Sequence, residues 1–264
     1  MLSMHARSAV FDVFGDLLAD RNHQSTVAGL VRLLAPVGIT APAVRTAVSR
    51  MVSQGWLTPV RLPGGRGYAA TDRAIQRFAS ALERSYRPNP KEWEGQWHLL
   101  LTSPPNGRTE RARLARELTY LGYATIQDNT WVSPYPRAEL DDVLERNDTT
   151  AVQVLTAEVS PCSAPLEAWD LDALAASYRS WHARAAGTVE QHLAAHTDPD
   201  EAAFAARFHL VHEWRKFLFT DPGLPLELLP ADWPGTAASD YFAQMADELN
   251  ERASAFVTRV LSQD

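Results

Sequence analysis

The 264-residue sequence has few of the features that mark secreted proteins, membrane proteins and disulfide-rich or zinc-stapled scaffolds. It holds one cysteine, Cys162, which excludes an internal disulfide and argues against a structural zinc site of the multi-cysteine type. No apolar run approaches the length of a membrane span, and residues 1–7 lack the apolar stretch of a signal peptide. We therefore expect a cytoplasmic protein that has no membrane partner.

Lysine is absent from the first third of the chain, and acidic residues are scarce there. Residues 1–88 hold 11 arginines and 5 acidic residues, a net charge of +6. Residues 89–264 hold 14 basic and 27 acidic residues, a net charge of −13, which makes the whole chain acidic at −7. Such asymmetry predicts a basic binding module carried on acidic domains.

Carboxylates are also absent from one whole predicted helix, the stretch Thr40–Trp56. Its apolar residues recur at helical spacing and form one face: Val44, Ala47, Val48 and Met51. The opposite face carries arginine and hydroxyl side chains: Arg45, Thr46, Ser49, Arg50 and Ser53. Arginine, threonine and serine donate hydrogen bonds to phosphates and base edges, so this face suits a polyanion. The alternative is an ordinary amphipathic surface helix.

The segments before this stretch predict two more helices, over residues 7–18 and from Gln24 or Ser25 to about residue 34. Pro36 and Gly38 break the chain between the second predicted helix and Thr40–Trp56. Two helices joined by a short turn, the second with a basic outer face, are typical of a helix-turn-helix.

After Gly55 the apolar period changes, and residues 56–62 and 67–70 read as two short strands. A hairpin directly after a recognition-type helix is a wing, and it would place Arg61 and Arg66 near its tip, in reach of sugar-phosphate or the minor groove. The alternative for the glycine-rich turn is a phosphate-cradling nucleotide loop. That loop would need the Lys-Ser/Thr of a P-loop, which this turn lacks.

The rest of the chain predicts two further domains. The Pro-rich stretch 87–90 ends a winged-helix domain, residues 1–88. Residues 89–165 have the order β-α-β-β-α-β of a ferredoxin-like domain. Residues 166–264 look all-helical, apart from the Pro-rich loop Asp221–Gly235, whose leucines and tryptophan must pack on something. The fold class is therefore α+β.

A search for chemistry finds no catalytic constellation, no cofactor motif and no metal-ligand motif. His209 and His212 do not have the order of a zinc-protease motif, and the pair His192 and His196 has no matching carboxylate. One helix near residue 210 nonetheless concentrates cations and aromatics: Arg207, His209, His212, Trp214 and Arg215. They predict either a pocket for an anionic, aromatic effector or a solvated basic face.

Four motifs resemble those of the PaaX-like family, the phenylacetic acid catabolism repressors. They are Ala9–Asp16, Val44–Arg50 with Gly55-Trp56, Trp93–His98, and Asp221–Gly235 with its Asp-Trp-Pro-Gly end. The resemblance covers essentially the whole chain. It implies a winged helix, a central domain similar to Cas2, a helical C-terminal domain, and a homodimeric repressor released from its operator by an aryl-acyl-CoA. The strand end Leu101-Thr-Ser103 offers no aspartate for a Cas2-type metal, so we expect no nuclease activity.

The sequence thus favours a DNA-binding repressor of an aromatic-acid catabolic operon, controlled by a small effector and not itself an enzyme. Two alternatives stay open: a metal-independent enzyme acting on an acyl-CoA or a nucleic acid, and a protein-interaction adaptor whose winged helix binds another protein.

Overall fold

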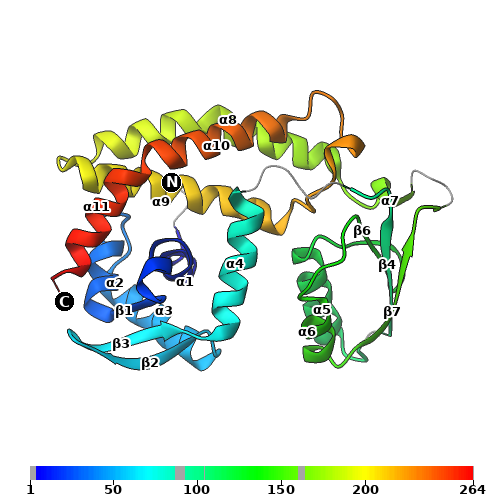
Figure 1. Ribbon diagram of the computed structural model, residues 1–264, viewed down its shortest axis with the longest axis horizontal. Helices are drawn as coiled ribbons and strands as arrows, with labels where there is room; N and C mark the ends of the chain where they lie inside the picture. Colours follow the sequence, from blue (N-terminus) through cyan, green and yellow to red (C-terminus); the bar gives the residue numbers. More distant parts are fainter. Residues whose placement is uncertain (1–3, 87–92, 104, 160–163, 264) are drawn as a thin grey trace. The chain divides into compact units, whose positions relative to one another are not determined.

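The computed structural model describes residues 4–86, 93–103, 105–159 and 164–263, and Figure 1 shows its helices and strands. The chain forms two compact units. The first unit comprises Met1–Tyr86, Trp181–Arg215 and Ser239–Asp264, and the second comprises Arg87–Ser180 and Lys216–Ala238. The C-terminal helical segment is therefore shared between the two units. The boundaries drawn from the sequence after residues 88 and 165 stay predictions, and the expected linker 87–90 lies outside the described residues.

The first unit contains a winged helix-turn-helix and a set of C-terminal helices. Its N-terminal elements are α1 (Ala6–Asp12), the π-helical turn η1 (Val13–Leu17), the 3₁₀ turn η2 (Ala19–Arg21), β1 (Gln24–Thr26), α2 (Val27–Leu34), α3 (Ala41–Ser53), β2 (Leu57–Leu62), β3 (Gly65–Ala70) and α4 (Asp72–Tyr86). Its C-terminal elements are the second half of α8 (Leu171–Ala194), α9 (Pro199–Trp214), most of α10 (Pro234–Glu248), and α11 (Asn250–Leu261).

Local capping explains where the two helices of the helix-turn-helix begin and end. The Thr26 side chain accepts a hydrogen bond from the Gly29 amide at 2.9 Å, so α2 begins at Val27. The expected start at Gln24 or Ser25 is wrong, because those residues pair with β3 in a three-stranded sheet of order β1-β3-β2. At the other end of α3, Gly55 takes a φ of 72° and terminates the helix, as expected.

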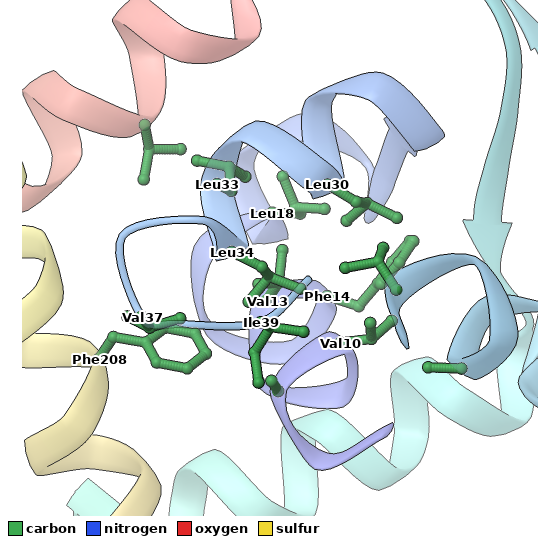
Figure 2. Close-up of a cluster of buried hydrophobic side chains, with 14 of the residues drawn as sticks. Val10, Val13, Phe14, Leu18, Leu30, Leu33, Leu34, Val37, Ile39 and Phe208 are labelled. Atoms are coloured by element: carbon green, nitrogen blue, oxygen red, sulfur yellow. The ribbon is translucent and has the colours of Figure 1, made fainter. Parts of the chain in front are cut away.

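One core joins the winged helix to the C-terminal helices of the first unit. Phe204 and Phe208 of α9 and Phe256 of α11 pack in the same buried cluster as the apolar faces of α1, α2 and α3. Figure 2 shows Phe208 beside Val37 within this cluster. Residues all around α9 are buried, so the helix has no solvent face along most of its length. Helices α9 and α11 are therefore part of the fold that carries α3.

The second unit contains the ferredoxin-like domain, and the expected α+β class is confirmed. Its elements are β4 (Trp97–Ser103), α5 (Arg108–Tyr120), β5 (Ala124–Gln127), β6 (Thr130–Ser133), α6 (Leu140–Arg146), β7 (Thr150–Thr156), α7 (Ala164–Glu167), the 3₁₀ turns η3 (Arg215–Phe219) and η4 (Leu226–Leu228), and the first half of α8. The strands form an antiparallel sheet of order β5-β6-β4-β7, and α5 and α6 lie together against one face of it (Figure 1).

The Pro-rich loop Asp221–Gly235 packs on its own unit. Leu224 is buried against Trp97 and Val132 of the sheet, and Leu228 and Leu229 pack on the same cluster. The apolar residues of the loop are therefore covered by the sheet of the second unit.

Candidate nucleic-acid interface

Helix α3 divides its side chains as the spacing predicts. Its apolar residues Val44, Ala47, Val48 and Met51 are buried in the core of the first unit. The predicted reading residues are all exposed: Arg45, Thr46, Ser49 and Arg50. The structure thus brings these four residues together on one solvent-facing surface, where they can approach a ligand as large as a DNA duplex.

The two arginines of α3 are not used by the fold. Within the described residues, the guanidinium groups of Arg45 and Arg50 take part in no hydrogen bond or ion pair. The hydroxyl of Thr46 differs, because it donates to the Pro42 carbonyl at 2.9 Å and is left as an acceptor. Arg45 and Arg50 therefore keep their donors for a ligand.

The wing places its two arginines side by side. In the β2–β3 hairpin Arg61 is directly opposite Arg66, and Leu62 is opposite Gly65 around the turn. Both arginines are exposed. Like charges opposite each other in an antiparallel pair are unfavourable, so the hairpin carries a repulsion that an anion would relieve. The nucleotide-loop alternative loses its support, since the glycine-rich stretch is a hairpin turn with β3 following it.

A close contact between strands fixes the position of the wing. A Cβ atom added to Gly67 would lie 2.9 Å from the Ser25 carbonyl oxygen, so only glycine lets β1 approach β3 this closely.

A groove of about 460 Å³ lies between α3 and the wing. Arg45 and Ser49 line it from the helix, and Arg66 lines it from the wing. Val48, Val52 and Tyr68 contribute its apolar wall. Helix α3 and the wing therefore share one concave surface that is lined by an arginine from each, which suits a sugar-phosphate strand passing between them.

The surrounding sequence adds no negative charge to this surface. Between Asp20 and Asp72 the chain has six arginines and no acidic residue. A phosphate that approaches α3 or the wing therefore meets no carboxylate from this stretch, and the local field favours polyanions even though the whole chain is acidic.

The residues predicted to bind an effector have other partners in the first unit. Arg207 is buried and forms an ion pair with Asp16 of η1. His212 Nδ1 lies 2.6 Å from one oxygen of Asp12, and an Arg215 nitrogen lies 2.6 Å from the other oxygen. Trp214 is buried and stacks on Phe242, with ring centroids 4.7 Å apart. The expected cation and aromatic cluster exists, but it faces acidic groups and rings of the protein.

His209, the fifth of these residues, stacks on His192 with ring centroids 3.8 Å apart. Burial, with neighbouring histidines, lowers the pKa of His209 to about 4, because a charged imidazole is poorly solvated there. Burial likewise lowers the pKa of His192. Both rings are therefore neutral at neutral pH and cannot act as cationic anchors for an anion.

Among the described residues no group of three histidine, cysteine or acidic side chains could hold a metal ion. Within the same part of the chain, no helix is long and apolar enough to cross a membrane.

Comparison with known proteins places these features in a family. A model of the PaaX-like protein matches residues 5–74, the PaaX central Cas2-like domain matches residues 90–168, and the PaaX-like C-terminal domain matches residues 169–259. The chain belongs to the PaaX-like family. The first of these matches spans α3 and the whole wing, so the candidate interface lies in a part of the chain that the family shares.

Two relatives of the PaaX-like chain are similar over nearly its whole length. The transcriptional repressor PaaX of Escherichia coli (strain K12) is 27% identical over 262 residues, which covers 95% of this chain and 82% of the repressor. The chain is thus homologous to a transcriptional repressor. The structure of the uncharacterized protein Rv0674 from Mycobacterium tuberculosis is 27% identical with a TM-score of 0.57, over 97% of this chain and all of that one.

The sequence reasoning missed Asp12 and Asp16, which accept hydrogen bonds from the cations of α9. Helical spacing gives no signal for this role, because it places both carboxylates opposite the predicted apolar face of Val10, Val13 and Phe14, where acidic side chains are ordinarily solvated.

Proposed function

We propose that this PaaX-like chain is a transcriptional repressor that binds double-stranded operator DNA through α3 and the wing. In this function Arg45, Thr46, Ser49 and Arg50 face the base edges of the major groove, and Arg61 and Arg66 hold the backbone or the minor groove. The observation that carries the proposal is the shared groove of about 460 Å³, lined by arginines from both α3 and the wing. The likeness to a transcriptional repressor supports the same function.

A titration with fluorescent duplexes tests this function. The probe duplex carries the region upstream of the genes beside the chain's own gene, and the control duplex carries the same bases in scrambled order. We expect the upstream duplex to bind at least about a thousandfold more tightly than the scrambled one at physiological salt. We also expect log affinity to fall linearly with log salt, because phosphate contacts release counterions. Equal affinity for the two duplexes would contradict specific operator binding.

We further propose that an aryl-acyl-CoA releases the repressor, and that the operon it controls serves the catabolism of an aromatic acid such as phenylacetate. The support is the family resemblance, while the position of the effector site near Arg207–Arg215 stays a prediction. Phenylacetyl-CoA added to the preformed operator complex should lower the fluorescence anisotropy, whereas acetyl-CoA at the same concentration should not. Unchanged anisotropy with phenylacetyl-CoA would remove this effector and leave operator binding untouched.

The repressor is proposed to act as a homodimer, since two half-sites fit a symmetric pair of recognition helices. The support is strand β7, an edge of the second unit's sheet. Val152 and Leu155 of this strand are 63% and 56% exposed, and Val154 is 40% exposed. An apolar edge strand left open to water is an aggregation hazard unless a partner covers it.

Sedimentation of the full chain should give the dimer mass, and Val152→Lys should shift it to the monomer. A wild-type monomer at micromolar concentration would contradict the proposal.

A further inference from the structure

Two arginines and one histidine of α9 and its C-terminal end meet two acidic residues of the winged helix, forming a largely buried polar cluster. The members of this cluster are Asp12, Asp16, Arg207, His212 and Arg215. Their side chains are between 9% and 11% exposed, so water screens them little. Charges this buried are costly unless each is paired, and the loss of one partner is strongly destabilising. The cluster therefore holds α1 and η1 against α9.

Asp12 is the centre of the cluster because both of its oxygens face donors. His212 Nδ1 and an Arg215 nitrogen each lie 2.6 Å from one of these oxygens. An ionised carboxylate only accepts hydrogen bonds, so His212 must donate its Nδ1 proton. An asparagine at position 12 would turn its NH₂ group toward one of the two donors, and one pairing would be lost.

The same contact continues toward the recognition helix. Phe11 precedes Asp12 in the chain, and the centre of its ring lies 5.1 Å from the Arg215 guanidinium carbon. Phe11 in turn packs edge-on against Trp56, just after α3, with ring centroids 6.0 Å apart. Helix α1 also packs directly on α3. A continuous set of contacts thus links α9 to the helix that carries the predicted reading residues.

Arg207 secures the other end of this arrangement. Its guanidinium binds Asp16 of η1, and its Nε donates to the Ala246 carbonyl of α10 at 3.3 Å. The π-helical turn that carries Asp16 also lies close to α4, since a Cβ atom added to Gly15 would be 3.1 Å from the Phe78 ring. Such turns are frequent at functional sites, where the extra residue redirects a side chain.

We infer that Asp12 and Asp16 are positioning residues for operator reading, and that the C-terminal segment sets the position of α3 through Arg207, His212 and Arg215. This inference rests on the proposed function, because it states how the DNA-reading surface is held. It gives the basic cluster of α9 a role that needs no bound anion. It also gives any change in the C-terminal segment a direct route to the recognition helix, because Arg215 is the last residue of that segment before the chain enters the second unit.

The test uses the full chain with Asp12→Asn, compared at a temperature well below its unfolding transition. We expect the affinity for the operator duplex to fall about tenfold and that for the scrambled duplex to change far less, because misplacing α3 impairs base contacts more than phosphate contacts. A merely stabilising ion pair would lower the unfolding temperature and leave the ratio of the two affinities unchanged.

Arg259→Gln is the matched control. Arg259 pairs with Asp198 and Asp200 at the start of α9, but its side chain is 46% exposed. Exposed pairs contribute little, and this pair does not touch α1, so the affinity ratio should remain that of the wild type. If Asp12→Asn does not fold, His212→Phe takes its place, because it removes one of the two donors and leaves the ion pair of Arg215. This variant should also lower the ratio of the affinity for the operator duplex to the affinity for the scrambled duplex.

Amide hydrogen exchange without DNA separates this inference from the proposed function. Asp12→Asn should speed exchange in α1 and α3 selectively, with α11 keeping its wild-type rates. A folded variant whose exchange in α3 and affinity ratio both match the wild type would overturn the inference. A wild-type chain that binds no duplex would overturn the proposed function, and the exchange result would still decide whether Asp12 positions α3.

Discussion

At the scale of single residues, the candidate interface differs from the basic cluster of α9 in one respect. Arg45, Arg50, Arg61 and Arg66 are exposed and take no partner from the described part of the chain. Arg207 and Arg215 have equal charge, but their side chains are only 10% and 11% exposed and are paired with carboxylates. A guanidinium that the fold does not use is available to a ligand, whereas one that is paired inside the protein stabilises the fold.

Arg45→Ala and Arg50→Ala should each weaken specific operator binding by about 1–3 kcal/mol if they form bidentate contacts to guanine. Folding should be nearly unaffected, since both side chains are exposed. Titration of the upstream duplex measures the loss, with circular dichroism as the check on folding. Arg108→Ala, an exposed arginine of α5 in the second unit, is the control and should bind as the wild type does. Wild-type affinity in both α3 variants would remove this helix from the reading role.

Arg66→Ala should act differently, because a wing-tip arginine on phosphate carries no sequence information. We expect similar losses on the upstream and scrambled duplexes, and a salt slope smaller by roughly one unit. Affinity measured over a range of salt concentrations checks both. If the variant instead loses preference at a single base position, Arg66 is a base reader and the assignment of the wing to phosphate is wrong.

At the scale of elements, α3 and the wing are predictable because their signals are local. Apolar spacing, Gly55 and the glycine-rich turn each act within a few residues. Strand β1 is not predictable, since three residues carry no period and its pairing depends on Gly67 of a later strand. The role of Arg207, His212 and Arg215 is not predictable either. Their acidic partners lie 191 to 203 residues away in the chain, and periodicity says nothing about such distances.

The stacked histidines of the α8–α9 hairpin make the first unit sensitive to acid. The pKa of His209 is lowered from 6.5 to about 4, so the folded state favours the neutral ring. The stability that depends on this ring is fully present above pH 6.5 and is lost as the pH falls from 6.5 toward 4. His209→Phe, which keeps an aromatic ring in the stack, should therefore lose less stability on acidification than the wild type.

Urea unfolding at about pH 7.5, 6, 5 and 4 measures the stability that the wild type and His209→Phe each lose on acidification. His182→Gln is the control, because His182 is exposed on the same helix α8 and should leave the wild-type profile unchanged. Parallel stability profiles for the wild type and His209→Phe would show that His209 does not carry the acid sensitivity.

At the scale of the whole molecule, the winged helix folds as one unit with helices α9 and α11, which the division into three domains does not suggest. Phe204 and Phe208 of α9 and Phe256 of α11 fill the core between α1, α2 and α3. The Asp12 and Asp16 contacts add charge pairing to the same surface. The fragment 1–88 would expose this apolar surface and leave both carboxylates without their partners.

We therefore expect the fragment 1–88 to unfold without a cooperative transition and to lose operator affinity, even though it contains every predicted DNA-binding residue. Thermal circular dichroism and the upstream-duplex titration check the two expectations. A fragment that melts cooperatively and binds with the affinity of the full chain would show that the C-terminal helices are not needed to position α3.

The central claim is that the exposed face of α3 lies on operator DNA. Photo-crosslinking tests it most directly. The chain has a single cysteine, so after Cys162→Ser a cysteine introduced elsewhere is the only attachment point for the crosslinker. An azidophenacyl group on Ser49→Cys should crosslink to the upstream duplex, and unlabelled upstream duplex should compete while scrambled duplex does not. The same group on Arg108→Cys is the control. It should give no specific crosslink, that is, none that unlabelled upstream duplex removes and scrambled duplex leaves in place. DNA binding without any crosslink from position 49 would contradict the account.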